Sequence, residues 1–136
     1  MIPDPGLPLP VPTPDNREFY EAARRGELRF QRCAACGRFR HYPRPICPSC
    51  LSREFSWEQV SGRGSVFTWT IVRGPTLPAF AHKVPYNVVD VLLEEGVHFV
   101  AEVPDCPPDA IHAGLTVVAT FVPVSDEITL VKFRRA

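Results

Sequence analysis

Two closely spaced pairs of cysteines are the feature that most constrains how this chain can fold. Cys33 and Cys36 form the first pair, and Cys47 and Cys50 form the second. Each two-residue gap allows a tight turn, so four thiolates can surround one metal ion tetrahedrally at about 2.3 Å. Because the protein supplies all four ligands, no coordination position remains for water or substrate. We therefore expect a structural metal site in a ribbon, with Zn²⁺ as the metal.

Other uses of paired cysteines fit this pattern less well. Disulfides are rare in cytosolic proteins, and a redox dithiol normally needs one pair near a βαβ unit, which this sequence lacks. Iron stays open as an alternative, because a tetrahedral set of four sulfurs also suits iron. Cys106 is a fifth cysteine with no catalytic motif around it.

Composition indicates a soluble protein with a packed core. Apolar residues make up 45% of the chain, and its apolar runs fall far short of the roughly 20 residues that a membrane helix requires. The first residues lack the basic start and apolar segment of a signal peptide. We expect a cytoplasmic protein without a membrane partner.

Charge is divided unevenly along a chain whose formal net charge is zero. Residues 24–53 hold eight arginines and one acid, Glu27, which gives this segment a net charge of +7 and the remainder −7. The zero total argues against a general nucleic-acid binder. The four cysteines lie within the basic segment, so the ribbon is expected to carry the positive charge.

The chain before the cysteines predicts an arm and a helix. Residues 1–14 contain six prolines and are expected to run extended. A disordered tail is slightly favoured over an arm that lies along the domain or a partner. Residues 15–27 predict a short helix that Asp15 caps and Gly26 ends. One face of this helix is apolar and consists of Phe19, Ala22 and Ala23.

The chain after the second cysteine pair predicts an all-β domain. Residues 28–56 are assigned to the ribbon and residues 57–136 to a small barrel of the OB type. Its strands are rich in β-branched and aromatic residues, and residues 104–112 form a connection with room for one helical turn. We expect five strands, at residues 66–72, 87–93, 97–103, 115–122 and 128–134. The fourth strand reads as buried on both faces.

Motifs spread along the chain resemble one known family. They are Cys33-Ala-Ala-Cys36-Gly37, then Cys47-Pro-Ser-Cys50, then the strand entry Ser61-Gly62-Arg63-Gly64, with Val131-Lys132-Phe133 near the end. Together they are similar to the zinc-ribbon plus OB-fold family that was catalogued as a domain of unknown function and is now called acyl-CoA-associated. The resemblance covers residues 15–134. It implies a mainly β fold: an N-terminal helix, a rubredoxin-like four-cysteine zinc ribbon and a five-stranded OB-fold barrel.

The same resemblance implies an accessory role. Members of this family pair with thiolase-superfamily enzymes, including thiolases, acyltransferases and the retro-aldolases that shorten steroid side chains as CoA thioesters. The small subunit stabilises its partner and helps form the acyl-CoA site, while the partner carries the catalytic residues. The expected partners are therefore a thiolase-superfamily subunit and acyl-CoA.

Two groups of residues are candidates for contacts with CoA or the partner. Arg38, Arg40 and Arg44 lie in the basic ribbon, and arginine binds phosphate in a bidentate manner. It is equally consistent that these arginines only keep a small domain soluble. The second group lies in loop 74–86, where ligand contacts often concentrate, and consists of Phe80, His82 and Tyr86. Ordinary packing of Phe80 and Tyr86 beneath their own loop explains this group as well. His41, inside the ribbon, reads as a surface histidine.

Two other functions deserve comparison with the accessory role. A nucleic-acid-binding module is the alternative, because OB folds and zinc ribbons both serve there. Against it stand the zero net charge, only two lysines, and six acids without a lysine or arginine between Asp90 and Asp109. An independent enzyme is rejected, because a nucleophile needs a base and an orienting group, and His82, His98 and His112 are scattered among the segments.

Overall fold

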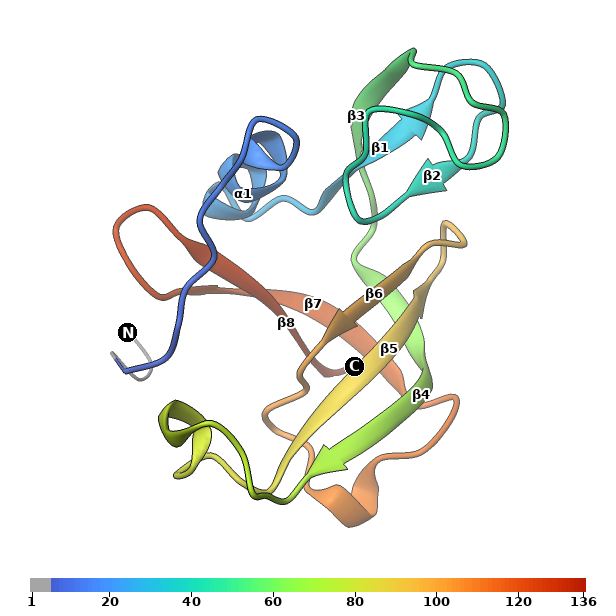
Figure 1. Ribbon diagram of the computed structural model, residues 1–136. Coiled ribbons are helices and arrows are strands. Elements are labelled where there is room, and N and C mark those ends of the chain that lie inside the picture. The colour runs from blue at the N-terminus through green and yellow to red at the C-terminus, as the bar shows by residue number, and fades with distance from the viewer. Residues whose placement is uncertain (1–5) are drawn as a thin grey trace.

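The computed structural model describes residues 6–136 and consists of one helix, a small ribbon sheet and a larger curled sheet (Figure 1). The helix lies beside the large sheet, and the ribbon projects from one end of the molecule. The elements are α1 (Arg17–Arg24), β1 (Arg29–Cys33), β2 (Phe39–Arg40), β3 (Phe55–Gln59), β4 (Arg63–Val72), η1 (Pro78–Phe80), β5 (Tyr86–Leu93), β6 (His98–Ala101), η2 (Pro108–Ala110), β7 (Thr116–Pro123) and β8 (Thr129–Arg135). No helix in residues 6–136 is long and apolar enough to cross a membrane.

Helix α1 forms where the sequence predicts it, but its N-terminus differs from the prediction. The N-cap is Asn16, without a side-chain capping bond, so the prediction that Asp15 caps the helix is wrong. The Asn16 side chain instead accepts a hydrogen bond from the Thr13 backbone N–H at 2.6 Å, which holds the preceding turn. Gly26 follows the helix at a φ of +76°, a conformation that suits glycine and confirms the predicted end. The predicted apolar face is buried, with Phe19, Ala22 and Ala23 all below 9% exposure.

The ribbon sheet has the strand order β2-β1-β3, and all its pairs are antiparallel. β1 pairs with β3 over five residue pairs, from Arg29 opposite Gln59 to Cys33 opposite Phe55. The chain then continues from β3 into β4 of the large sheet. Residues 56 and 57, where the sequence divides ribbon from barrel, both lie within β3.

The large sheet has the order β6-β5-β4-β7-β8 and confirms the five predicted strands. It curls until its two outer strands approach: the Phe133 N–H on β8 donates to the Glu102 carbonyl just after β6 at 2.9 Å. This order and this closure are those of a partly open OB barrel. The predicted turn in the 104–112 connection is present as η2. In β7 only Val117 is buried, so the prediction that this strand is buried on both faces is wrong.

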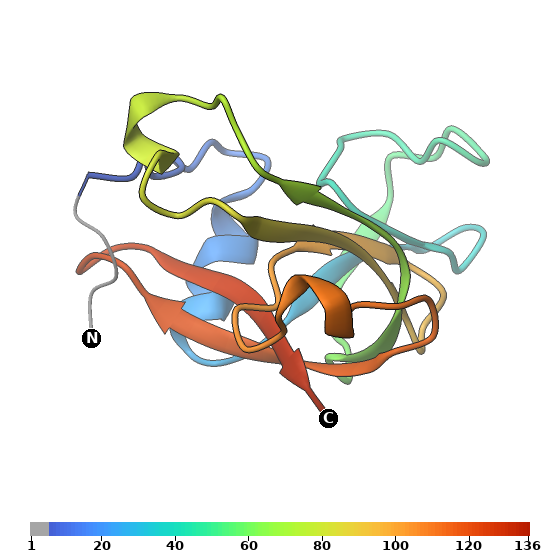
Figure 2. The same ribbon diagram turned by 90° about the horizontal axis from the view of Figure 1, so that it is seen from below.

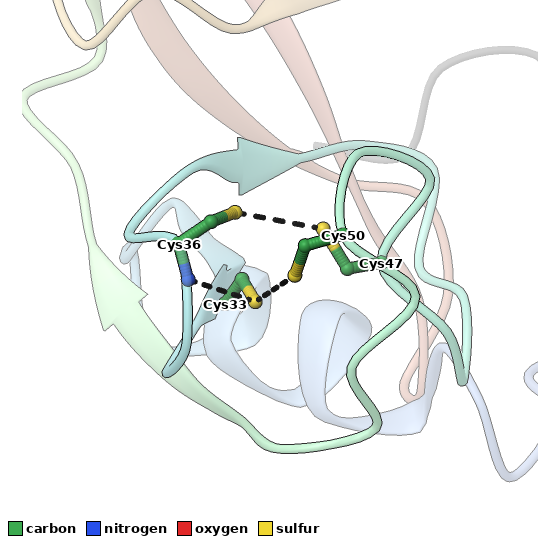
Figure 3. A group of neighbouring side chains, drawn as sticks. All are labelled: Cys33, Cys36, Cys47 and Cys50. Atoms are coloured by element: carbon green, nitrogen blue, oxygen red, sulfur yellow. Dashed lines mark hydrogen bonds between the residues drawn. The ribbon is translucent and has the colours of Figure 1, made fainter.

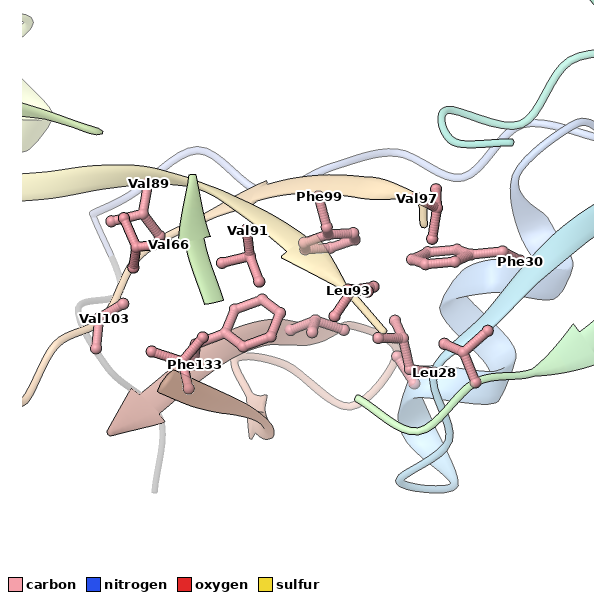
Figure 4. Packing of buried hydrophobic residues seen from close by; sticks show 14 of the residues in the cluster. Leu28, Phe30, Val66, Val89, Val91, Leu93, Val97, Phe99, Val103 and Phe133 are labelled. Atoms are coloured by element: carbon pink, nitrogen blue, oxygen red, sulfur yellow. The ribbon is translucent and has the colours of Figure 1, made fainter. Parts of the chain in front are cut away.

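One apolar core fills the barrel and extends to the helix and the base of the ribbon (Figure 4). Figure 2 shows the curl of the large sheet from below. Every second residue of β5 points inward, and Val89, Val91 and Leu93 are at most 2% exposed. Phe133 closes the core from β8 at 0% exposure. Leu28 and Phe30 bring the start of the ribbon into the same cluster, as Figure 4 shows.

The glycines of the Ser61-Gly62-Arg63-Gly64 entry are required by close packing. A Cβ at Gly64 would strike the Leu92 carbonyl oxygen and would lie 2.9 Å from Leu93 Cα. Gly62 has a φ of +76°, and a Cβ there would lie 3.1 Å from the Ala119 Cβ. These glycines let β4 cross closely over β5 and β7.

Candidate metal centre

Each cysteine pair forms the same backbone turn, which aims two sulfurs at a common point. In the first turn the Gly37 N–H donates to the Cys33 carbonyl at 2.9 Å, and in the second the Leu51 N–H donates to the Cys47 carbonyl at 2.9 Å. The residue after each pair is left-handed, with a φ of +77° at Gly37 and +66° at Leu51. The two halves of the site are therefore structurally equivalent, although only the first uses the glycine that this conformation favours.

The four sulfurs have the separations that a tetrahedral metal requires (Figure 3). The Sγ atoms of Cys33 and Cys50 are 3.5 Å apart, and those of Cys36 and Cys47 are 3.7 Å apart. All four sulfurs lie within 4.8 Å of one another. A tetrahedron with bonds of about 2.3 Å has edges of about 3.8 Å. The residues therefore fit a metal, and Cys33, Cys36, Cys47 and Cys50 are confirmed as one cluster.

Backbone amides and neighbouring thiols set the charge of the cluster. The N–H of Cys36, 3.5 Å from the Cys33 sulfur, is the main cause that lowers the pKa of Cys33 to about 6. The N–H of Cys50 in the same way lowers the pKa of Cys47. At Cys50 the Ser52 amide alone would lower the pKa, but the adjacent thiols and burial raise it to about 11. Without a cation the four thiols cannot all ionise together. A divalent ion removes this repulsion, and four thiolates leave no open position on it.

A buried arginine supports the loop between the two cysteine pairs. Arg40 is only 6% exposed; its Nε donates to Gln31 Oε1 at 2.8 Å and its Nη2 to the Arg44 carbonyl at 2.8 Å. The Arg44 N–H donates to the same Gln31 oxygen at 2.8 Å, and the Arg40 guanidinium lies over the Phe55 ring. Arg40 therefore braces the ribbon, and its burial separates it from any phosphate at the surface.

The remaining contact candidates fall into two separate places. Arg38 and Arg44 are exposed on the ribbon, and Arg38 Nη1 donates to Ser49 Oγ at 3.1 Å. In loop 74–86 the Phe80 and Tyr86 rings stack 6.0 Å apart, and His82 is exposed. Figure 1 places the ribbon and this loop at opposite ends of the molecule, so the structure does not bring the two groups together.

The described part of the N-terminal arm lies along the barrel. Leu7, Pro8 and Leu9 line a cavity of about 260 Å³ together with Phe80 and Tyr86. Lys83 and Lys132 border the same cavity and both donate to Glu102 Oε1, at 3.1 and 3.0 Å. The prediction of a disordered tail is therefore wrong for these three residues. Residues 1–5 of the predicted arm lie outside the described residues.

His41 is half-buried among aromatic rings, so its prediction as a surface histidine is wrong. Its ring lies 5.3 Å from Phe19, 5.0 Å from Phe30 and 4.8 Å from Phe99, measured between ring centroids. Burial lowers the pKa of His41 to about 4. Its Nδ1 is buried without a partner among residues 6–136. The helix, the ribbon and the barrel thus meet at this neutral ring.

The sequence reading missed an exposed aromatic pair on β4. Phe67 is 58% exposed and Trp69 is 39% exposed, although both belong to a strand that was expected only to build the barrel. The sequence from Phe67 to Val72 is uncharged and predicts a β-strand. It does not indicate which side of the strand is covered by the rest of the protein.

Comparisons with known proteins agree with this architecture. Two family models match consecutive parts of the chain: the rubredoxin-like zinc ribbon domain of ChsH2 over residues 21–56 and the C-terminal OB-fold domain of ChsH2 over residues 57–122. A DUF35 domain-containing scaffold protein of Methanothermobacter thermautotrophicus is 33% identical over 113 residues, which cover 82% of this chain and 84% of the relative. This chain belongs to the ChsH2/DUF35 family.

Two other relatives are longer than this chain. A probable enoyl-CoA hydratase alpha subunit of Thermomonospora curvata is 38% identical over 95% of this chain, and the match covers 40% of that relative. A 3-oxo-4,17-pregnadiene-20-carboxyl-CoA hydratase alpha subunit of Mycobacterium tuberculosis is 32% identical over 86% of this chain and 37% of its own length. The chain thus spans well under half of these two relatives.

The comparison with solved structures extends the match to three dimensions. A chain of the structure titled "Ltp2-ChsH2(DUF35) aldolase" has 37% identity and a TM-score of 0.83, over 93% of this chain and 98% of that chain. A DUF35 protein from Sulfolobus solfataricus has a TM-score of 0.60 at 13% identity, which shows that the fold persists in a distant sequence.

Proposed function

We propose that this chain is a non-catalytic accessory subunit that binds and stabilises a thiolase-superfamily enzyme and helps form its acyl-CoA site. The observation that carries the proposal is the match to nearly the whole DUF35 chain of a structure whose title names an Ltp2 aldolase. Two hydratase alpha subunits whose names specify CoA thioesters, and a DUF35 domain-containing scaffold protein, are similar to this chain in sequence.

The chemistry of the described residues supports a subunit without its own active site. Cys106 is buried, and burial raises the pKa of its thiol, which disfavours a nucleophilic thiolate. The exposed His98 pairs through Nδ1 with Asp90 Oδ1 at 2.8 Å, but no serine or cysteine within residues 6–136 hydrogen-bonds to that ring. Within the described part of the chain, His112 bonds only to the neighbouring Ala113 carbonyl. A histidine and a carboxylate without a nucleophile do not make a catalytic set.

Zinc is the proposed metal of the four-cysteine cluster. The cluster has four sulfurs, no oxygen or nitrogen ligand and no open position, which is the usual arrangement for structural zinc. Bound there, the ion would hold the two turns together and supply no reaction chemistry. Elemental analysis of protein from metal-balanced medium should find about one zinc per chain, and iron at the same level would contradict the proposal.

The acyl-CoA contact is assigned to the exposed candidates. Arg38 and Arg44 keep surface guanidinium groups suited to CoA phosphates, whereas Arg40 does not. The arm and loop 74–86, with Phe80, His82 and Tyr86, are proposed to contact the enzyme subunit.

Coexpression tests the accessory role. A tagged copy of this chain is expressed with the thiolase-superfamily subunit encoded beside it, and acyl-CoA turnover is assayed for the pair and for each chain alone. We expect a stable pair on size-exclusion chromatography and activity that depends on both chains. Full activity and stability of the enzyme subunit alone would contradict the proposal, and so would turnover by this chain alone.

A further inference from the structure

The second half of β4 has a backbone edge that nothing in residues 6–136 covers. On one side β4 pairs with β5 from Gly64 opposite Leu93 to Val72 opposite Tyr86, with a bulge at Phe67. On the other side it pairs with β7 only from Arg63 to Ser65. The last backbone bonds on that side involve Val66, whose N–H donates to the Leu115 carbonyl and whose carbonyl accepts from the Gly114 N–H. Beyond Val66 the ladder groups on this side meet no described backbone.

This open edge is uncharged, long and rich in residues that favour strands. It reads Phe67-Thr68-Trp69-Thr70-Ile71-Val72, with no proline, glycine or charged residue. Six residues span about 20 Å of strand. Proteins usually blunt such edges with charges, prolines or short strands, because an unprotected edge pairs with other chains.

Other strand edges of the described molecule are protected in these ways. β2 is only two residues long. β3 carries Glu58, which bonds to Arg32 Nη1 at 3.3 Å. The outer edges of β6 and β8 approach each other through the Phe133 to Glu102 hydrogen bond. The edge from Phe67 to Val72 has no charge and no proline, whereas the end of β7, which likewise extends beyond its pairing with β4, contains Pro123.

The occupant that fits this edge is another strand. A helix satisfies its own backbone groups, whereas unpaired ladder groups are satisfied by an extended segment. The incoming strand should be uncharged over about six residues, because a charge buried against Phe67 and Trp69 would lose its hydration without gaining a partner. Exposed tryptophan is also a residue type that contributes strongly to protein interfaces.

We propose that a strand of the thiolase-superfamily subunit pairs with β4 along Phe67–Val72 and covers Phe67 and Trp69. This inference rests on the proposed accessory function and adds the surface through which it acts. β4 leads directly into loop 74–86 (Figure 1), so a strand at this edge and the loop would form one continuous contact. A strand alone buries less than the roughly 1,000 Å² of a stable interface, and the loop supplies the rest.

Two variants test the edge without removing core residues. Thr68→Lys with Thr70→Lys places charges on exposed positions of the edge; position 68 lies opposite Asp90, so no like charges meet across the pair. Trp69→Ala removes the exposed ring. The matched control is Thr116→Lys, an exposed threonine on β7, whose neighbours are already paired with β4 and β8.

Binding is measured to the thiolase-superfamily subunit that copurifies with the tagged wild-type chain, after each variant is shown to retain its metal and its thermal transition. The double lysine variant should weaken the complex by at least about 30-fold and Trp69→Ala by at least about tenfold. The control should bind like wild type. Hydrogen exchange should show amides within residues 67–72 becoming protected when the wild-type complex forms.

The outcomes separate this inference from the function on which it rests. Wild-type chain that binds no such subunit overturns both, and this appears before any variant is made. Wild-type binding with full affinity in both variants, or with no new protection at residues 67–72, overturns the edge alone. Light scattering of the free chain provides the last control. If the free chain is a homodimer that the double lysine variant dissociates, while the enzyme complex is unaffected, a second copy occupies the edge and the proposal is overturned.

Discussion

The ribbon tip and the barrel are stabilised in opposite ways, although they belong to one small chain. From residue 34 to residue 54 only Arg40 and Cys47 are fully buried, and His41 is half-buried at the base of the ribbon. The barrel instead buries a continuous apolar set that includes Val66, Val89, Leu93 and Phe133. A segment without an apolar core cannot offset the conformational entropy of ordering its residues. We therefore expect the ribbon tip to depend on a bound metal, whereas the barrel depends on packing.

The two regions also differ in the polar groups that they bury: the ribbon buries a charged side chain, and the barrel core does not. Arg40 can be buried in the ribbon because Gln31, the Arg44 carbonyl and the Phe55 ring receive it. The barrel core has one buried amide, Asn87, which donates to the Val103 carbonyl at 2.9 Å and accepts from the Val103 N–H at 2.8 Å. In both regions most buried polar atoms have hydrogen-bond partners, although Arg40 Nη1 has none among the described residues.

The largest expected effect is loss of the ribbon when one ligand is removed. Cys47→Ser should release nearly all bound metal and unfold residues 34–54, because metal binding at such sites supplies about 10 kcal/mol or more of folding free energy. The barrel should keep its thermal transition. Elemental analysis and hydrogen exchange measure the two regions separately.

The matched control for that variant is Cys106→Ser, which changes the buried cysteine of the barrel. It should leave the metal content unchanged and affect only the barrel's stability. If Cys47→Ser kept a protected ribbon tip without metal, the contrast between the two regions would fail.

The converse test removes packing from the barrel. Phe133 is fully buried, so Phe133→Ala should lower the free energy of unfolding by about 3–5 kcal/mol. For a chain of this size that corresponds to roughly 10–20 °C in Tm. The four-cysteine cluster should still bind its metal. Phe67→Ala removes a ring that is 58% exposed and should change Tm far less; equal losses from the two rings would contradict the packing account.

His41, where the ribbon and the barrel meet, allows a test through the pH dependence of stability. Burial lowers the pKa of His41 to about 4, below the ordinary value of 6.5. The unfolded chain then binds more protons than the folded one between these values, so His41 reduces stability as pH falls from about 6.5 to 4 and has no effect above 6.5. The loss should reach about 2–3 kcal/mol.

The measurement is the difference between wild type and His41→Phe in urea unfolding across that range, which cancels the titration of other groups. His41→Phe should flatten the pH dependence, and it also removes the buried Nδ1 that has no partner among the described residues. Identical slopes for the two proteins would show that the ring titrates as an exposed histidine.

These two regions also differ in how far the sequence predicts them. The four-cysteine cluster could be predicted from the sequence, because the cysteines form two local turns with a short and regular spacing. The five strands followed from alternation of apolar residues, which is also local. The position of His41 could not be predicted, since it depends on Phe19, Phe30 and Phe99 from three separate segments. Arg40 was read as a surface candidate for a similar reason: Gln31, which receives it, lies on a different strand.

The open edge of β4 shows the same limit. Phe67 and Trp69 have the composition of a barrel strand, and whether β7 covers them depends on where the β4–β7 ladder ends. That end is set by the turn at Gly114, whose N–H binds the Val66 carbonyl at 2.8 Å. The extent of pairing depends on both strands, which are far apart in sequence, so the sequence of β4 alone does not predict it.

The smallest expected effect concerns the one difference between the two metal-binding turns. Leu51 has a φ of +66° where the equivalent Gly37 has +77°, and Leu51 is 74% exposed. A side chain in this conformation costs about 1–2 kcal/mol, and the greater freedom of glycine in the unfolded chain cancels about 0.5–1 kcal/mol of any gain. Leu51→Gly should therefore stabilise the ribbon by about 0.5–1 kcal/mol, seen as slower metal loss to a chelator, while Gly37→Leu should speed that loss. A faster loss from Leu51→Gly would mean that the leucine side chain, despite its exposure, packs on the ribbon more strongly than its backbone is strained.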